Sequence, residues 1–168
     1  MSTLYLTMHT PDQYDSFLID AFTSFVKNMY GLGARKIGVT SLPPLGCVPL
    51  ARTLFGYHEK GCISRFNTDA QQFNKKLNSA AANLQKQHSD LRIVVLDIFK
   101  ALFHIVKSPS NYGFVEATKG CCGTGTVETT NSCAIRIHQE HVPMRPSMCF
   151  GTVSVHLMLL IKSLPIGV

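Results

Sequence analysis

The first strong pattern in the chain is an apolar repeat with the spacing of an amphipathic helix. Apolar side chains recur at i, i+3, i+4 and i+7, so one face of this helix is expected to be buried. That face comprises Tyr14, Phe17, Leu18, Ala21, Phe22, Phe25, Val26 and Met29. Thr10, Pro11 and Gln13 form a helix start, because Thr caps, Pro suits the first turn and Gln closes a capping box. Gly31 and Gly33 predict its end.

Two short β-rich runs follow, and each leads toward a further helical pattern. Residues 36–40 predict a buried strand, and the uninterrupted apolar run 92–97 is typical of a central parallel strand that is covered on both faces. Between them an apolar stripe predicts a helix over about 64–88, and a third helix follows over about 98–107. This order is typical of α/β domains, so we expect adjacent parallel strands joined by a right-handed crossover. Open edges of such a partial sheet would allow self-association.

The composition is that of a globular chain, with 45% hydrophobic and 15% charged residues in 168, enough for one domain. The formal net charge is +6, but the basic residues are scattered and are not interleaved with aromatic residues. A solvated surface is therefore favoured, and no nucleic-acid partner is expected. The apolar run 155–161 is too short to cross a bilayer, so no transmembrane segment is expected either.

Six cysteines are more than a cytosolic domain of this length usually carries. They contain no Cys-x-x-Cys spacing, so a zinc site is disfavoured and disulfides in an oxidising compartment fit better. Residues 1–20 contain no apolar signal region, which leaves the compartment of the chain open. A missing N-terminal region would reconcile the two observations. Cys47 and Cys62 flank a loop of moderate length and are disulfide candidates, worth about 3 kcal/mol if they pair.

Four stretches, in order and at fitting separations, resemble the plant GDSL esterase/lipase family of the SGNH hydrolase superfamily. They are residues 30–37 (YGLGARKI), 42–47 (LPPLGC), 73–78 (FNKKLN), and 112–114 (YGF) with 121–125 (CCGTG). The resemblance covers about residues 10–130. It implies a three-layer αβα, flavodoxin-like domain with a five-stranded parallel sheet, of which this chain would be a C-terminal-half fragment.

The resemblance also implies a reaction, the hydrolysis of lipid or other acyl esters through an acyl-enzyme. A Ser of a Gly-Asp-Ser motif attacks, a Gly and an Asn help to hold the oxyanion, and an Asp-x-x-His block completes the triad. This chain has no Gly-Asp-Ser and no Asp after Asp97, so no residue is assigned as catalytic. Ser41, His138, His141 and His156 are interpreted as bystanders. No metal or other cofactor is implied.

The family-like loop after the first strand is the candidate site. Because ligands of α/β domains bind beyond the carboxyl ends of strands, this loop is expected to border an acyl or alcohol pocket, with a purely structural loop as an equal alternative. The rim residues are Leu42, Pro43, Pro44, Leu45 and Gly46. Asp97 also follows a strand, and for it a helix cap is the favoured role.

The last 38 residues differ in composition from the rest of the chain. They hold three of the seven histidines and three of the six methionines but only one acidic residue, Glu140. Read back by one base with permitted codons, Cys149-Phe150-Gly151-Thr152 can spell Val-Phe-Trp-Asp, and the shifted frame resembles the family's C-terminus over some thirty residues. We therefore predict a partial esterase domain over 1–130 and an aberrant, frame-shifted tail over 131–168. The pairing of Cys121, Cys122, Cys133 and Cys149 stays open.

Three functions follow from these observations. The favoured one is a fragment of a secreted plant hydrolase of lipid metabolism that is inactive alone. A working hydrolase with an unorthodox site is disfavoured, because every triad position is missing. The alternative is a non-catalytic, disulfide-bearing interaction module that reuses the same fold. The family implies an acyl-ester small molecule as substrate and an extracellular location.

Overall fold

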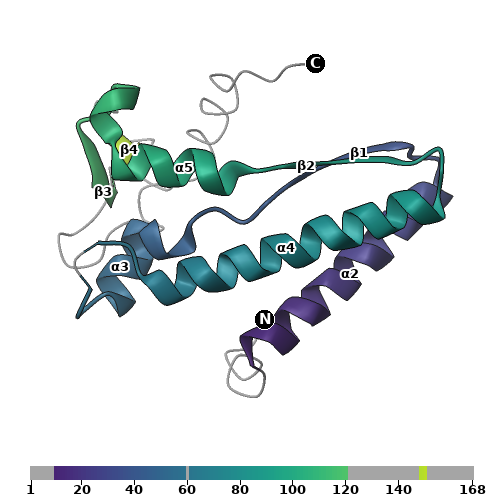
Figure 1. Cartoon of the computed structure of the whole chain (residues 1–168), viewed down its shortest axis with the longest axis horizontal. Helices are drawn as coiled ribbons and strands as arrows, with labels where there is room; N and C mark the ends of the chain where they lie inside the picture. The colour runs from purple at the N-terminus through teal and green to yellow at the C-terminus, as the bar shows by residue number, and fades with distance from the viewer. Residues whose placement is uncertain (1–9, 60, 121–147, 151–168) are drawn as a thin grey trace, which may run out of the picture. The chain divides into compact units, whose positions relative to one another are not determined.

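The structure is a computed structural model that describes residues 10–59, 61–120 and 148–150 (Figure 1). In chain order its elements are α2 (Pro11–Gly31), β1 (Lys36–Thr40), η1 (Leu45–Cys47), α3 (Pro49–Phe55), α4 (Ser64–Gln87), β2 (Arg92–Leu96), α5 (Ile98–Lys107), η2 (Pro109–Tyr112), β3 (Glu116–Gly120) and β4 (Met148–Phe150). The chain divides into two compact units, which we describe separately. The first is Met1–Pro43 with Thr68–Lys100, and the second is Pro44–Asn67 with Ala101–Val168.

Strands β1 and β2 of the first unit pair in parallel, as the sequence predicts. Lys36 lies opposite Arg92 and Thr40 lies opposite Leu96, so the pairing runs the full length of both strands. Helices precede, connect and follow the strands in the predicted order, which confirms a partial α/β domain. Strand β2 ends at Leu96, one residue earlier than predicted, because Asp97 caps the helix that follows.

Helix α2 begins where the sequence predicts. The Gln13 N–H donates to the Thr10 hydroxyl at 3.3 Å, and the Thr10 N–H donates to the Gln13 side-chain carbonyl at 3.0 Å. This reciprocal capping box satisfies two of the N–H groups that a helix start leaves unpaired. After Gly31 the chain turns through Gly33, whose φ of 99° lies in the region that favours glycine.

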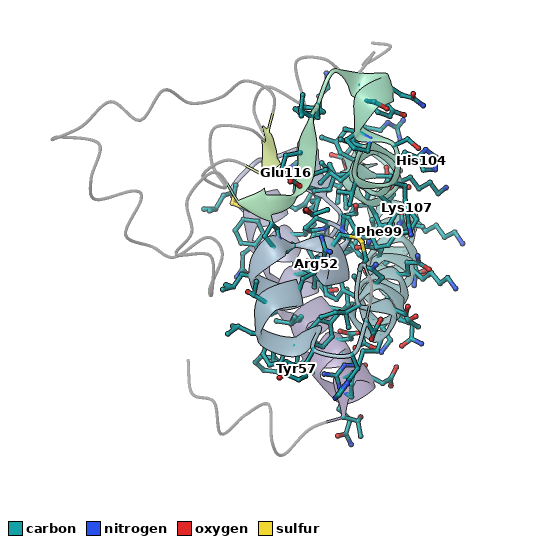
Figure 2. The ribbon with its side chains drawn as sticks, turned by 90° about the vertical axis from the view of Figure 1, so that its left-hand side faces the viewer. Arg52, Tyr57, Phe99, His104, Lys107 and Glu116 are labelled. Carbon is teal, nitrogen blue, oxygen red and sulfur yellow. A yellow bond between two sulfur atoms is a disulfide. The ribbon has the colours of Figure 1, made fainter. Side chains whose placement is uncertain are left out.

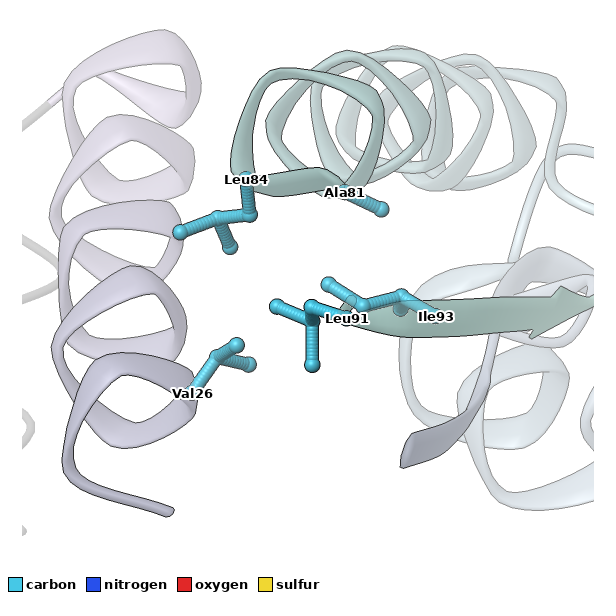
Figure 3. Packing of buried hydrophobic residues seen from close by; sticks show 5 residues of the cluster. All are labelled: Val26, Ala81, Leu84, Leu91 and Ile93. Atoms are coloured by element: carbon cyan, nitrogen blue, oxygen red, sulfur yellow. The ribbon is translucent and has the colours of Figure 1, made fainter. Parts of the chain in front are cut away.

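The core of the first unit lies between one face of the sheet and two helices. Val26 of α2, Leu84 of α4 and Leu91 before β2 are almost completely buried and point toward one another (Figure 3). Ala81 and Ile93 complete the cluster. Removing the apolar area of these side chains from water, at about 25 cal/mol per Å2, is what holds the helices on the sheet.

The opposite face of the sheet is uncovered in the part of the chain that the structure describes. Val94, in the middle of β2, is 58% exposed, and Gly38 and Thr40 of β1 are also exposed. The prediction of a strand covered on both faces is therefore wrong for these residues. The prediction failed because the residues between Arg92 and Asp97 are all apolar, as in a fully buried strand, although only alternate side chains meet the core.

A polar cluster fixes the ends of the first unit's elements that lie away from the candidate site. The Arg35 Nε donates to Asp90 Oδ2 at 2.6 Å, and the Tyr30 hydroxyl donates to Asp90 Oδ1 at 2.8 Å. The hydrogen bond from Tyr30 lowers the pKa of the Asp90 carboxyl, and Arg35 adds to this effect. The Arg35 guanidinium also lies 4.1 Å from the Tyr30 ring centroid. The end of α2 is thereby tied to the turn before β2.

The second unit contains elements that the sequence pattern did not predict. Helix α3 has only seven residues, too few to show an amphipathic repeat. Strand β3 is short, and its Ala117 packs with Ile105 of α5 in a small buried cluster. Strand β3 pairs in parallel with β4 through an irregular register.

Strand β4 lies within residues 131–168, the tail that the sequence predicts to be aberrant. The boundary at 130 stays a prediction. Residues 121–147 and 151–168 lie outside the described part, and so do the side chains of all four cysteines whose pairing was left open. The frame-shift hypothesis for the tail stays a prediction.

The expectation that one apolar face of α2 is buried is wrong for Phe17 and Phe25, which are 41% and 57% exposed, and for Ala21. Asp15, which is not part of that apolar repeat, is instead buried.

Asp15 is 8% exposed, and its Oδ2 accepts no hydrogen bond from any described residue. Lys76 lies nearby on α4, but its ammonium group is 2.7 Å from Asp12 Oδ1 and donates to the Asp12 carbonyl and the Ser16 hydroxyl. Burial raises the pKa of the Asp15 carboxyl, against the opposing effect of Lys76. Folding therefore favours the protonated form.

We predict that Asp15→Asn stabilises the chain at neutral pH. Because the pKa of Asp15 is higher in the folded than in the unfolded chain, its contribution to stability is greatest in acid and falls as pH rises through the folded value. The neutral amide should gain on the order of 0.5 kcal/mol at pH 7, since surface water screens part of the effect. Urea unfolding followed by circular dichroism, at pH 7 and near pH 3, measures the difference.

The matched control is Asp12→Asn, one turn earlier on the same helix. It removes the ion pair with Lys76 and should not stabilise the chain at neutral pH. A gain for Asp15→Asn that is equally large in acid, or a loss at pH 7, would contradict this interpretation of the buried carboxyl.

Candidate functional site

Ser41 is the first residue beyond β1, at the carboxyl end of the sheet. Its N–H donates to the Leu96 carbonyl at 2.9 Å, and its Oγ accepts a hydrogen bond from the Ile98 N–H at 3.0 Å. The side chain is buried. Ser41 thus continues the strand pairing by one step and helps to cap α5, and this use of its oxygen gives it a structural role.

Asp97 stands at the carboxyl end of the neighbouring strand. Its Oδ1 accepts from the N–H groups of Phe99 at 3.1 Å and Lys100 at 3.3 Å. A carboxylate at this position satisfies unpaired N–H groups of α5 and complements the positive end of the helix dipole. The capping role that the sequence favoured for Asp97 is confirmed.

The first half of the candidate loop is held by a side chain of α4. Asn74 donates from Nδ2 to the Leu42 carbonyl at 3.0 Å, and its Oδ1 accepts from the Leu42 N–H at 2.7 Å. The amide thereby satisfies both backbone polar groups of Leu42, as a neighbouring strand would. This contact fixes the direction in which the chain leaves the sheet.

The second half of the loop is held by another asparagine, Asn67, in the second unit. The Gly46 N–H donates to Asn67 Oδ1 at 2.9 Å, and the Ile63 N–H donates to the Gly46 carbonyl at 2.8 Å. Asn67 is buried, and its Nδ2 lies 3.5 Å from the Cys47 sulfur. A Cβ on Gly46 would lie 2.0 Å from the Ile63 carbonyl oxygen, so only glycine fits here.

A disulfide closes the same segment covalently. Cys47 and Cys62, the candidate pair, are joined across 15 residues, with their Cα atoms 4.3 Å apart. By the chain-entropy argument a loop of this size stabilises the fold by about 3 kcal/mol. Cys47 is completely buried, so the bond is shielded on that side.

The five predicted rim residues differ in what they can present to a ligand. Leu45 is exposed, and Leu42 and Pro43 are partly exposed. Pro44 and Gly46 are buried and act as anchors of the loop. Side-chain contact with a ligand is therefore available from three of the five positions.

The described residues offer no reactive constellation beside this loop. No group of three or more His, Cys, Asp or Glu side chains in residues 10–59, 61–120 and 148–150 is placed to hold a metal ion. His88 stacks on the Tyr30 ring at 4.2 Å, which gives it a packing role. The histidines at 138, 141 and 156 lie outside the described residues. No described helix is long and apolar enough to span a bilayer.

Sequence reasoning missed both asparagines that hold the loop. Asn74 lies in one of the family-like stretches, but nothing in a lone sequence says that its amide faces the backbone of Leu42. Asn67 interrupts no pattern, because asparagine is ordinary on the exposed side of a helix. The one available signal is its spacing, because Asn67 stands three residues before Ala70, on the side of the helix that carries the apolar stripe.

Comparison with known proteins identifies a family. Residues 2–143 match the family model described as GDSL-like Lipase/Acylhydrolase. GDSL esterase/lipase APG of Arabidopsis thaliana is 66% identical over 131 residues, which are 78% of this chain and 37% of that protein. GDSL esterase/lipase At5g03810 of the same plant is 51% identical over 125 residues, 74% of this chain and 35% of that protein. The chain thus spans just over a third of the length of these relatives.

We predict that Asn74→Ala and Asn67→Ala each destabilise the fold by about 1–3 kcal/mol. Each substitution leaves backbone groups of the loop without their hydrogen-bond partners. The larger cost is expected for Asn67→Ala, because the buried Gly46 N–H then has no acceptor. The free energy of unfolding from urea titration measures the effect. Asn83→Ala, on an exposed position of the same helix, is the control and should be neutral or slightly stabilising. Equal effects at all three positions would contradict the assigned role.

Proposed function

The chain belongs to the GDSL-like lipase/acylhydrolase family, and we propose that it supplies a substrate-bordering loop of a carboxylic ester hydrolase but not the attacking groups. The observation that carries this proposal is the loop after β1. Its backbone is fixed by Asn74, Asn67 and the Cys47–Cys62 disulfide, while Leu42, Pro43 and Leu45 keep exposed surface. A partly apolar loop that follows the carboxyl end of a strand, with the backbone of each of its halves fixed within its own unit, suits the acyl or alcohol part of an ester.

The same residues support the proposal that the chain is inactive by itself. Its 168 residues contain no Gly-Asp-Ser and no Asp beyond Asp97, so the family's nucleophile and its Asp-x-x-His pair are missing. The serine at the strand end, Ser41, uses its oxygen to accept from the Ile98 N–H and is buried. Ester hydrolysis needs a nucleophile within hydrogen-bond reach of a base, and no described pair supplies it.

The relatives' names support ester or lipid substrates and leave the individual ester open. The disulfide supports an oxidising location, as expected for a secreted plant hydrolase. For residues beyond about 130 we retain the frame-shift proposal. The nucleotide sequence from the Thr129 codon onward tests whether the reading frame changes there.

We predict that the purified chain hydrolyses short p-nitrophenyl esters no faster than a buffer blank. The physical reason is the absence of an activated serine, and release of p-nitrophenol is the measurement. Saturable hydrolysis that a serine-directed phosphonate abolishes would contradict the proposal. In that event Ser41→Ala tells whether the structural serine has become the nucleophile.

A chimera tests the rim. The 131 matched residues of this chain would replace their counterparts in the 66%-identical relative, which supplies the rest of the domain. We expect esterase activity from the chimera, and about tenfold lower kcat/KM when Leu45→Asp places a charge on the rim. Val115→Asp is the control, because Val115 is exposed and lies outside the loop. Activity that is insensitive to Leu45→Asp would leave the loop a structural role only.

A further inference from the structure

A second surface of the chain combines exposed aromatic and cationic side chains. It lies within the second unit, on α3, the turn after it and the start of α4. Tyr57 is 92% exposed, and Phe55 and Leu54 are 56% and 53% exposed. We name these three residues, together with Arg52 and Arg65, the aromatic–cationic patch; Arg52 and Tyr57 are labelled in Figure 2. Neither the family's reaction nor the candidate loop uses them.

Two members of the patch, Phe55 and Arg65, are joined through Phe66, a partly buried residue of α4. The rings of Phe55 and Phe66 meet edge to face with centroids 5.5 Å apart. The Arg65 guanidinium lies 4.8 Å from the centroid of the Phe66 ring, so this cation stands beside the aromatic pair. Apolar area and positive charge therefore share one surface.

Hydrogen bonds and a disulfide hold the described backbone on either side of residue 60 beneath the patch. After α3 the Gly56 N–H donates to the Arg52 carbonyl at 2.9 Å, and the Glu59 N–H donates to the Gly56 carbonyl at 3.0 Å. The Glu59 carboxylate accepts from the Ser64 N–H at 2.9 Å. The disulfide between Cys47 and Cys62 closes the segment. Exposed aromatic side chains on a fixed framework bind with little further loss of conformational entropy.

The size of the apolar part argues against a stable protein partner. Three side chains with these exposures offer roughly 300–400 Å2, whereas a specific protein interface needs about 800 Å2 from each partner. A second copy of the chain would also place its own cationic side chains against those of the first copy, and these would repel one another. The segment Pro44–Asn67 carries three basic residues, Arg52, Lys60 and Arg65, against one acidic residue, Glu59. The small apolar area and the excess of positive charge both favour a negatively charged partner into which the exposed side chains insert only shallowly.

We propose that the aromatic–cationic patch binds the surface of an anionic lipid bilayer, with Tyr57, Phe55 and Leu54 inserted at headgroup depth and the exposed Arg65 beside lipid phosphates. Arg52 is partly exposed and donates to the Thr118 carbonyl, so it adds positive charge to the patch from a fixed position. Tyrosine favours this depth because its ring is apolar and its hydroxyl stays hydrated. Each arginine near an anionic surface adds about 1 kcal/mol, or about fivefold in partitioning. The contact goes beyond ester hydrolysis and is independent of it.

The test uses the oxidised 168-residue chain and sucrose-loaded vesicles of phosphatidylcholine, with and without phosphatidylglycerol. We expect sedimentation with the anionic vesicles, weaker sedimentation with the neutral ones, and loss of the difference in high salt. Tyr57→Ser should weaken partitioning about fivefold on both kinds of vesicle. Arg65→Gln should weaken it by a similar factor on anionic vesicles only. Tyr112→Ser, at a position that is 51% exposed outside the patch, should leave partitioning unchanged.

Because the chain contains no Trp, single-tryptophan variants report insertion directly. The emission of Tyr57→Trp should shift to the blue on anionic vesicles, and that of Tyr112→Trp should not. Tyr57 is exposed, so its variants should keep the wild-type circular dichroism and the disulfide. Equal binding to both vesicles, no effect of Tyr57→Ser, or the same loss in Tyr112→Ser overturns the proposal. Dissociation of an oligomer by Tyr57→Ser in the absence of vesicles overturns it too, because it assigns the patch to a second copy.

Discussion

The parallel pairing of β1 with β2 is the interaction on which the rest of the first unit depends. Parallel strands cannot be joined by a tight turn, so the chain between them has to travel back along the sheet, and α4 makes that return. The same pairing brings the carboxyl ends of both strands to one edge. Ser41 and Asp97 therefore meet the start of α5, and Leu42 comes within reach of Asn74. Because one face of the sheet is buried, the register is fixed, and the positions of these residues are fixed with it.

At the carboxyl edge of the sheet, the residues whose position suggests reactivity already accept hydrogen bonds from the start of α5. A serine and an aspartate beyond neighbouring strands are what an α/β hydrolase site would need, yet both serve the N-terminus of α5. A helix start leaves N–H groups unpaired, and short polar side chains are the ones that can reach them. At these two strand ends, Ser41 and Asp97 therefore stabilise the start of α5.

The elements that were predictable are those in which local and tertiary signals agree. Helix α2 could be placed by its capping box together with its apolar repeat, and β1 and β2 by composition together with α/β order. Helix α3 is too short for a repeat, and β4 lies where composition gives no period. Asn67 and Asn74 could not be assigned, because their roles depend on which backbone groups of the loop come to lie opposite them. The need for glycine at position 46 likewise arises from the close approach of Ile63.

The disulfide links the two surfaces of this chain that carry functional proposals. One half-cystine, Cys47, ends the candidate loop, and the other, Cys62, lies just before α4, with the aromatic–cationic patch largely between them. Without the covalent bond, Asn67 and the hydrogen bond between Ile63 and Gly46 would have to hold both segments. Net hydrogen bonds contribute only about 1 kcal/mol each, less than the roughly 3 kcal/mol of the closed loop. Reduction of the disulfide should therefore loosen the backbone on both sides of it, at Gly46 and at Ile63.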